Sequence, residues 1–383
     1  MEIDMKRNLG LLCVLLLALA AGCAGCNNVA GTEEKAPEGQ DSLAIMTWNV
    51  QALFDGDENG TEYDDYRESA DWNREKYKGR LNVIARAIDG MERKPDVIAL
   101  EEVESATVVA DLAAAFSGRY GWTHFAVIPE MALGVGLLSR FPLSEAKSHS
   151  VSIDGEIAPR PMMEARVNVA AGDGTPSLLA LFVCHWKSKL GGDDATESTR
   201  RASARIILRR IRELAQTEPE LPVIIMGDLN ENYDEFYRRN GVAISALLPD
   251  DPRAAEFSGL YGLDGGDEDA IKELQKDFII LSKVKPPTVR YFPDTVVALY
   301  SPWTVELQDG SYYYKNDWET IDHFLLSPQL FDETGWEFEN CAVVNYPPFV
   351  STTKGLPVAY NPRTGNGLSD HLPLLLSLKM RKP

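Results

Sequence analysis

The sequence predicts an α/β (α+β) protein in which two β-sheets pack face to face and helices cover them from outside. Apolar runs of strand length are numerous along the chain, whereas segments with helical spacing are few. From Ser42 onward these segments follow one another without a linker or an internal repeat. A chain of 383 residues, 44% hydrophobic and 25% charged, carries enough apolar side chains for such a layered core.

Each predicted element rests on its own pattern. LAIMTWNV (43–50) is mostly apolar, as in a buried strand, and in residues 80–91 Leu81, Ile84 and Ile88 share one helix face. In chain order, the predicted elements are a strand at 43–50, a helix at 80–91, a strand at 96–103, a helix at 108–116, strands at 122–128, 134–139, 162–169 and 178–185, a helix at about 197–216, a strand at 222–227, and closing strands at 320–327 and 372–380. Residues 231–320 contain aromatic and Gly/Pro-rich stretches typical of loops.

The N-terminus is typical of a targeting segment rather than of a fold. Lys6 and Arg7 precede an apolar stretch at 9–21 that is too short to span a bilayer as a helix. The following LAAGC (19–23) resembles a bacterial lipoprotein signal, in which Cys23 becomes the lipidated first residue; an ordinary secretory signal cut nearby is the alternative. We expect a signal peptide at 1–22, a flexible tether at 23–41 and one domain at 42–383, anchored outside the cytoplasm to a bacterial membrane.

The charge balance limits the partners of the protein. The formal net charge is −20, which disfavours non-specific adsorption to nucleic acid or anionic lipid, because both are polyanions. It does not exclude a metal-dependent enzyme that acts on phosphate, because a bound cation reverses the sign of the charge locally.

The five cysteines do not form a disulfide framework. Cys13 falls in the signal, Cys23 at the lipidation site and Cys26 in the tether, so that only Cys184 and Cys341 belong to the domain. A bridge between these two is possible outside the cytoplasm, although no feature of the sequence supports it.

Polar residues stand at the ends of apolar strands in several short motifs. They are Asn49 in TWNV, Glu101 and Glu102 in ALEEV, His185 in FVCHWK, Asp228 and Asn230 in IIMGDLNE, Asp322 in TIDHF, and Asp370 and His371 in GLSDHLPL. Any one of them alone is more often a turn former or a cap. Together they are the acids, amides and histidines that phosphate chemistry with Mg²⁺ needs, since Mg²⁺ takes few protein carboxylates and keeps water and phosphate in its shell. The mature domain contains no HExxH or CxxC pair with zinc-site spacing.

These motifs, in this order, resemble the endonuclease/exonuclease/phosphatase superfamily, which has the deoxyribonuclease-I-like fold. GDLN followed at a distance by SDHLP is the specific combination, and GVGLLSRFPL (134–143) adds a characteristic strand pair. The resemblance runs from about Leu43 to Lys379. It implies a four-layered α/β/β/α sandwich of two mixed sheets and a phosphoesterase that attacks with activated water.

The resemblance also implies roles for individual residues. Glu102 would bind the catalytic Mg²⁺ with Asn49 beside it; Mn²⁺ is an alternative ion, and Asp370 would either touch the metal or hold the geometry around it. His371 would deprotonate the attacking water while Asp322 fixes its tautomer. Asp228 and Asn230 would position the attacking water, and His185 would donate a hydrogen bond to a phosphate oxygen. Whether Asp228 or His371 activates the water stays open. Arg160, in APRPMMEARV, either contacts phosphate or is a solvated arginine.

Two charged segments have two readings each. Asp55–Tyr66 (DGDENGTEYDDY) begins like a calcium loop, with acids or an amide at positions 1, 3 and 5 and glycine at position 6, but Tyr66 replaces the expected glutamate, which favours a solvated acidic loop over a Ca²⁺ site. The arginine-rich part of the helix at 197–216 either follows a phosphate backbone or forms a solvated helix face.

The favoured function is a secreted, membrane-anchored phosphodiesterase of the nuclease type, with DNA or RNA as the substrate and a monomer as the working form. One alternative is a phosphoesterase on lipid or sugar phosphates, sphingomyelinase-like or inositol-phosphatase-like. For the lipid version, aromatic loops at 290–303 and 345–350 are candidate contacts. The other alternative is a surface binding lipoprotein on an inactive scaffold, against which the intact set of motif residues counts.

LFVCHWKSKLGG (181–192) places a cysteine directly before a histidine. Neighbours on a strand face opposite ways, so Cys184 and His185 cannot readily form a thiol–imidazole pair or share one metal. We expect Cys184 to be a packed small hydrophobe and His185 alone to face phosphate.

Replacing the two residues separately tests this interpretation. Cys184→Ser should keep most of the hydrolytic activity, because the predicted nucleophile is water. His185→Ala should lower the rate by roughly two orders of magnitude, as when one donor to a developing charge is removed. Steady-state rates on a single phosphodiester measure both changes. A larger loss from the cysteine change would show that the interpretation is wrong.

Overall fold

The structure is a computed structural model, and it describes residues 40–153, 156–158, 160–170, 176–258 and 276–381. The predicted signal peptide, Cys23 and residues 23–39 of the predicted tether lie outside the described residues. Among the helices that the structure describes, none is long and apolar enough to cross a bilayer.

The first of two large sheets has six strands in the order β17-β18-β1-β2-β4-β3. β1 runs parallel to β2 but antiparallel to β18, so the sheet is mixed. Its strands are β1 (Ser42–Leu53), β2 (Val97–Val103), β3 (Trp122–Ala126), β4 (Gly134–Ser139), β17 (Gly335–Val343) and β18 (Leu374–Arg381).

The second sheet has eight strands in the order β11-β12-β13-β16-β10-β9-β8-β5 and is mixed as well, because β10 runs parallel to β9 and antiparallel to β16. Its strands are β5 (Leu143–His149), β8 (Met162–Asn168), β9 (Leu178–His185), β10 (Val223–Asp228), β11 (Leu247–Pro249), β12 (Ile279–Ser282), β13 (Ala298–Tyr300) and β16 (Asp322–Leu326). Two hairpins stand apart from the sheets: β6 (Ser152–Ile153) with β7 (Glu156–Ile157), and β14 (Tyr312–Tyr314) with β15 (Asp317–Glu319).

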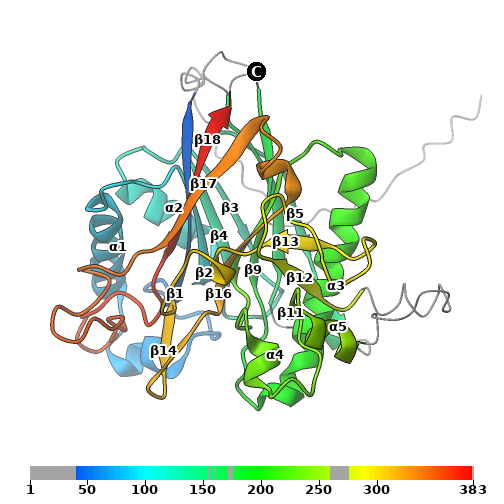
Figure 1. Cartoon of the computed structure of the whole chain (residues 1–383). Coiled ribbons are helices and arrows are strands. Elements are labelled where there is room, and N and C mark those ends of the chain that lie inside the picture. Colours follow the sequence, from blue (N-terminus) through cyan, green and yellow to red (C-terminus); the bar gives the residue numbers. More distant parts are fainter. Residues whose placement is uncertain (1–39, 154–155, 159, 171–175, 259–275, 382–383) are drawn as a thin grey trace, which may run out of the picture. The chain divides into compact units, whose positions relative to one another are not determined.

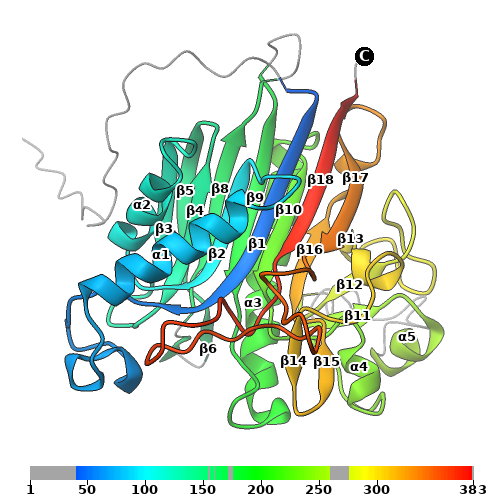
Figure 2. The ribbon, with the colours of Figure 1, turned by 90° about the vertical axis from the view of Figure 1, so that its left-hand side faces the viewer.

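Helices cover the outer faces of both sheets. Figure 1 shows α1 (Arg74–Asp89) and α2 (Ala106–Ala115) on one side of the strands and α3 (Asp193–Thr217) on the other, and Figure 2 shows α1 and α2 lying across the first sheet. The shorter helices are α4 (Glu235–Arg238) and α5 (Pro252–Ser258), with single 3₁₀ turns η1 (Asp64–Tyr66), η2 (Glu68–Ala70), η3 (Pro302–Thr304) and η4 (Pro328–Leu330).

Three buried apolar clusters separate the four layers. Between the sheets, Ile45 and Leu376 of the first sheet pack in one cluster with Leu181 and Met226 of the second. A second cluster joins α1 and α2 to the outer face of the first sheet, and a third joins α3 to the outer face of the second. Each sheet thus buries both of its faces. The predicted α/β/β/α sandwich of two mixed sheets is confirmed.

The predicted elements differ from the observed ones where the local sequence pattern is weak or where a side-chain cap sets the boundary. The helix predicted at 80–91 begins six residues earlier, because the Asn73 side chain accepts hydrogen bonds from the backbone N–H groups of Glu75 and Lys76 and caps the helix there. The sequence does not predict β5, since its side chains are mostly exposed and polar, as suits a sheet edge. Strands β11 and β13 have three residues each, too few for a periodic signal.

Candidate active site

The candidate site lies at the edge where the carboxyl ends of the central strands meet. The parallel pairs β1–β2 and β9–β10 each end on the same side of their sheet. Antiparallel β16 places its first residue, Asp322, opposite the last residue of β10, Asp228, which is also in register with His185 of β9. His371 lies just before β18, which runs antiparallel to β1 and so brings His371 to the same edge. Topology therefore collects residues from across the sequence.

A glycine permits the close contact of β9 and β10 beside Asp228. Gly227 has a φ of 129°, and a Cβ there would lie 1.9 Å from the backbone oxygen of Cys184. Only glycine can take this backbone conformation at this distance. The GD pair in GDLNE thus sets the position of the carboxylate that follows it.

Glu102 takes a left-handed backbone conformation, φ 64°, where the register between β2 and β4 shifts. Its carboxylate accepts a hydrogen bond from the backbone N–H of Ala52 at 2.8 Å, and Ala52 is left-handed too, with φ 52°. Glu101 is fully buried instead and accepts from the Thr47 hydroxyl at 3.0 Å. Backbone strain of this kind costs about 1–3 kcal/mol per residue and clusters at functional sites. The side chains of Glu101 and Glu102 thus lie in different surroundings, as the sequence predicts. The cause is the bulge at Glu102 as well as the alternation of side chains along the strand.

Asn49 joins the acids of the two sheets. Its Nδ2 donates to Asp228 Oδ2 at 3.0 Å and to Glu102 Oε1 at 3.4 Å. The other oxygen of Asp228, Oδ1, accepts from the backbone N–H of Asn230 at 2.9 Å, and Asn230 Nδ2 donates to the backbone oxygen of Trp186 at 3.2 Å. Both oxygens of the Asp228 carboxylate thus accept a hydrogen bond from an amide N–H, which fixes the orientation of the carboxylate toward the site.

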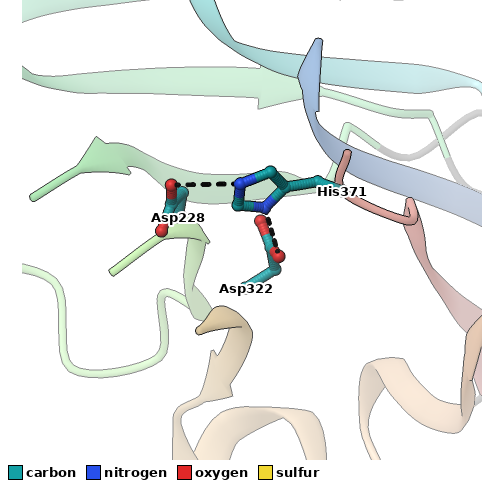
Figure 3. A group of neighbouring side chains, drawn as sticks. All are labelled: Asp228, Asp322 and His371. Atoms are coloured by element: carbon teal, nitrogen blue, oxygen red, sulfur yellow. Dashed lines mark hydrogen bonds and ion pairs between the residues drawn. The ribbon is translucent and has the colours of Figure 1, made fainter. Parts of the chain in front are cut away.

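His371 and Asp322 form a hydrogen-bonded pair that faces Asp228 (Figure 3). His371 Nδ1 lies 2.9 Å from Asp322 Oδ2, and the other ring nitrogen, Nε2, lies 4.0 Å from Asp228 Oδ2. All three residues are buried. Because the carboxylate of Asp322 holds Nδ1, the remaining nitrogen is the one directed toward Asp228, which is the arrangement of an oriented base.

The protonation of this pair differs from that of free side chains. Burial lowers the pKa of His371, but the carboxylates of Asp322, Asp228 and Asp370 outweigh burial and bring it well above the ordinary histidine range. Burial raises the pKa of Asp228 to about 7, although His371 acts in the opposite direction. The imidazole is therefore a strong base, and Asp228 changes its protonation close to neutral pH.

His185 faces the two acids that Asn49 joins. Its Nε2 lies 3.6 Å from Asp228 Oδ2 and 3.8 Å from Glu102 Oε1, and the residue is buried. Burial, with help from Arg160 and His371, brings the pKa of His185 well below its ordinary range, so the ring is neutral and carries one N–H. Cys184 lies on the opposite face, in the apolar cluster under α3, and is a free thiol, as is Cys341.

Asp370 and Arg160 lie at the border of the site. The backbone N–H of Asp370 donates to Gln51 Oε1 at 3.1 Å, and its carboxylate acts electrostatically on His371. Arg160 acts electrostatically on Tyr63, His185 and Lys187. The structure thus brings every residue singled out from the strand-end motifs to one edge of the sandwich, with Arg160 close by.

A comparison with family models matches residues 44–249 to the endonuclease/exonuclease/phosphatase family. The chain belongs to this family. No curated protein sequence matches the chain.

Solved structures of endonuclease/exonuclease/phosphatase fold resemble the chain at low identity. A family protein from Bacteroides thetaiotaomicron is 16% identical, with a TM-score of 0.49 over 90% of this chain and 97% of that one. Truncated TDP2 from Caenorhabditis elegans is 12% identical, with a TM-score of 0.49 over 88% and 97%. A mannosyl-6-phosphatase from B. thetaiotaomicron is 16% identical, with a TM-score of 0.48 over 88% and 99%. Identities this low do not indicate a substrate.

The donors of the site fit a hard divalent cation, on which endonuclease/exonuclease/phosphatase enzymes typically depend. The Glu102 side chain is 22% exposed, whereas the carboxylates of Asp228 and Asp322 are almost fully buried. Asp228, Asp322 and His371 also place one ligand atom each within 4.8 Å of the others, but His371 Nδ1 and Asp322 Oδ2 already engage each other. Of these three carboxylates Glu102 is the accessible one, and its oxygens suit Mg²⁺ or Mn²⁺.

Asn49 fits the metal less directly than the sequence predicts. In this structure its Oδ1 accepts from the backbone N–H of Gln51 at 3.0 Å, and its Nδ2 faces the acids. The amide thus connects Glu102 to Asp228 and does not turn its oxygen toward them.

The Asp55–Tyr66 loop does not gather calcium ligands. Asp57 pairs with Arg74 through both of its oxygens, at 2.7 and 2.6 Å, and Asp55 accepts from the backbone N–H of Asp57. The Asn59 side chain bonds Thr61 and Glu104. These contacts favour the acidic loop over the Ca²⁺ site.

Five arginines of α3 pair with acids, and two of them, Arg205 and Arg209, remain 56% and 65% exposed, which favours the solvated helix face over a phosphate-binding one. Arg200 is fully buried and bonds Glu231 at 2.6 Å and Glu197 at 2.8 Å. Arg201 and Arg205 both bond Asp277, and further along Arg210 holds Glu164. Some of these partners, such as Glu197, lie on the helix itself, whereas Glu231, Asp277 and Glu164 come from distant segments.

Some site residues escaped the sequence analysis because they act through partners far along the chain. Trp48 Nε1 donates to the backbone oxygen of His371 at 3.0 Å, and Trp303 Nε1 donates to that of Asp322 at 2.7 Å. Ser369 Oγ donates to the backbone oxygen of Asn49 at 2.7 Å. Trp48 and Ser369 stand directly before the motif residues Asn49 and Asp370, and this position is the sequence signal that could have found them. Trp303 adjoins no motif residue.

Removing the partner of His371 should move the pH dependence of hydrolysis. The base must be unprotonated, so activity should fall as the pH drops through the raised pKa of His371. Asp322→Asn removes the largest interaction that raises this pKa, so the acidic limb of the kcat/KM profile should move to lower pH. The maximal rate should fall by roughly 10²–10⁴-fold, the usual contribution of a general base. Exposed Asp317→Asn is the control, and a limb that stays in place would contradict the assignment.

Proposed function

We propose that the protein is a metal-dependent phosphodiesterase of the nuclease type, which cleaves phosphoester bonds in DNA or RNA with activated water. The observation that carries the proposal is the His371–Asp322 pair directed at Asp228, with Glu102 and His185 beside it. An oriented base, a carboxylate for a cation and a neutral donor are the parts that phosphoester hydrolysis requires.

In the proposed reaction, the oxygen of water bonds to phosphorus while the bond from phosphorus to the leaving oxygen breaks. His371 takes a proton from the water through Nε2, and Asp322 stabilises the imidazolium that forms. Asp228, held by Asn49 and by the backbone of Asn230, orients the water. Glu102 would hold Mg²⁺, or Mn²⁺ in its place, and the bound cation would neutralise charge on the phosphoryl oxygens.

Neutral His185 donates its N–H to a non-bridging oxygen of the phosphate. Its low pKa supports this role, because a neutral imidazole keeps a donor without adding a charge that would compete with a cation at Glu102. Arg160, which acts electrostatically on His185, supplies positive charge at the border of the site. In the alternative, Asp228 instead of His371 takes the proton from the attacking water, and the other residues keep their roles.

The burial of the aromatic loops favours nucleic acid over lipid. Phe292 and Trp303, in the loop at 290–303, and Phe349, in the loop at 345–350, are buried; Phe349 stacks edge-on against Trp48. These rings fill the protein interior, whereas Tyr346 of the second loop is 41% exposed, so the two loops together offer one exposed aromatic side chain to a bilayer and not the apolar patch that a sphingomyelinase-like enzyme would need. A phosphoesterase on sugar phosphates remains the alternative that the assay below separates.

The main test is a panel assay with Mg²⁺ and with chelator. Wild-type protein should hydrolyse plasmid DNA or RNA, and bis(p-nitrophenyl) phosphate, with Mg²⁺ and not with chelator. His371→Ala should lose roughly 10²–10⁴-fold in rate. Sphingomyelin and inositol and sugar phosphates in the same panel identify a different substrate class.

Three outcomes contradict the proposal. Hydrolysis that persists in chelator would show that the reaction does not need the metal. Hydrolysis that persists in His371→Ala would show that His371 is not the base. If wild-type protein cleaves none of the substrates, the result favours the alternative of a binding protein on an inactive scaffold. Cleavage of lipid or sugar phosphates alone keeps the chemistry and replaces the nuclease assignment.

We propose also that the protein is a monomer anchored outside the cytoplasm by a lipid on Cys23. The support is the sequence at 1–23, a basic start, an apolar stretch and LAAGC. Cys23→Ser should move the protein from the membrane fraction to the soluble fraction of the expressing cells, since the acyl chains supply the membrane affinity. Cys26→Ser is the matched control. Membrane retention of Cys23→Ser would contradict the anchor.

A further inference from the structure

The β14–β15 hairpin lies against the His371–Asp322 pair. Tyr312, the first residue of β14, forms an isolated antiparallel bridge with His371, and the backbone N–H of Leu372 donates to the backbone oxygen of Ser311 at 2.7 Å. The hairpin lies outside both large sheets, so its position beside the site is not a consequence of sheet pairing.

Two neighbouring side chains of this hairpin contact the two members of the pair. The ring of Tyr312 stacks on the imidazole of His371, with centroids 4.5 Å apart and planes inclined by 27°. Ser311 is fully buried, and its hydroxyl donates to Asp322 Oδ2 at 2.5 Å, the same oxygen that His371 Nδ1 contacts. Residues 311 and 312 thus touch the base and the acid that orients it.

We propose that Ser311 and Tyr312 position the His371–Asp322 pair for hydrolysis, with the ring of Tyr312 setting the orientation of the imidazole. This inference rests on the proposed function, because it needs His371 to act as the base. Tyr312 is then a positioning residue that acts through His371 and not through the substrate.

The need for such positioning follows from the contacts of the pair. The hydrogen bond at Nδ1 and the covalent bond to Cβ hold one side of the imidazole, but they leave the tilt of the ring less restricted at Nε2. A ring stacked on one face of the imidazole restricts this tilt. Asp322 has a similar freedom, since its Oδ1 is buried with no hydrogen-bond partner among the described residues. The Ser311 hydroxyl therefore shares in holding the one oxygen that orients His371.

The hairpin is itself tied to the body of the domain. The backbone N–H of Thr320, just after β15, donates to Asn232 Oδ1 at 2.7 Å, and Arg238 donates to the backbone oxygen of Trp318 at 3.1 Å. Lys189 reaches Glu319 at 3.4 Å. Three contacts thus hold β15 and the residue after it, and β14 pairs with β15 through Tyr312 and Glu319, so the ring of Tyr312 has a fixed support.

The same strand offers a matched control. Tyr314 lies on the same strand face as Tyr312 and stacks on it, with centroids 6.0 Å apart, but its side chain is 48% exposed. Tyr314 has no ring contact with His371 among the aromatic contacts of the described residues. Replacing it removes a ring of the same size from the same hairpin without touching the pair.

The experiment compares Tyr312→Leu, Tyr312→Phe, Tyr314→Leu and Ser311→Ala with the wild type in full-length protein. Rates are measured on bis(p-nitrophenyl) phosphate with Mg²⁺, and thermal unfolding is measured alongside. Tyr312→Leu should lower kcat by about 10- to 100-fold with KM nearly unchanged, since small displacements of a reacting group cost about this much. Tyr312→Phe should restore kcat to near the wild-type value, and Tyr314→Leu should leave it unchanged.

Each other result overturns the inference. An unchanged kcat in Tyr312→Leu shows that the ring does not position His371. A loss in Tyr312→Phe as large as in Tyr312→Leu assigns the role to the hydroxyl. If Tyr312→Leu fails to fold, Ser311→Ala decides, because it removes one oxygen only; an unchanged kcat there counts against positioning. Wild-type protein that is inactive, or active His371→Ala, contradicts the proposed function instead.

Discussion

The apolar packing of the two sheets against each other is the constraint on which the site depends. The carboxyl ends of β1 and β2 belong to one sheet and those of β9 and β10 to the other, so no site exists until the sheets meet. Asn49 marks the meeting point, because its amide donates across the interface to Asp228. A large apolar cluster fills the space between the sheets, and the polar groups of the site gather at one edge of it.

Burial then gives the gathered groups their chemistry. Acids and histidines that would titrate normally in water are placed where charged forms are costly, so the pKa of Asp228 rises and that of His185 falls. His371 is the exception, because its carboxylate neighbours outweigh burial. One edge of the sandwich therefore holds a strong base, a neutral hydrogen-bond donor and an accessible carboxylate. A bound cation would balance the negative charge of the carboxylates there.

Positive residues of the chain serve structure more than recognition. Arg200 is buried against Glu231, directly after the GDLN motif, and so connects α3 to the loop that carries Asn230. Close to the site, Arg160 acts electrostatically on both His185 and Lys187. A protein at −20 that acts on a polyanion would thus rely on a bound cation and on few local contacts.

Much of the fold and of the candidate site could be predicted from the sequence, because both leave local signals. Apolar runs at 43–50, 222–227 and 372–380 mark buried strands, and Asp228, Asp370 and His371 stand beside the last two of them in short motifs. The bulge at Glu102, the buried pairing of Arg200 and the stack of Tyr312 on His371 left no such signal. The sequence by itself determined which residue types stand at the strand ends and how the layers alternate. Only the tertiary structure decided which ends meet, since contacts between residues 59 or 179 positions apart depend on how the sheets pack and not on local periodicity.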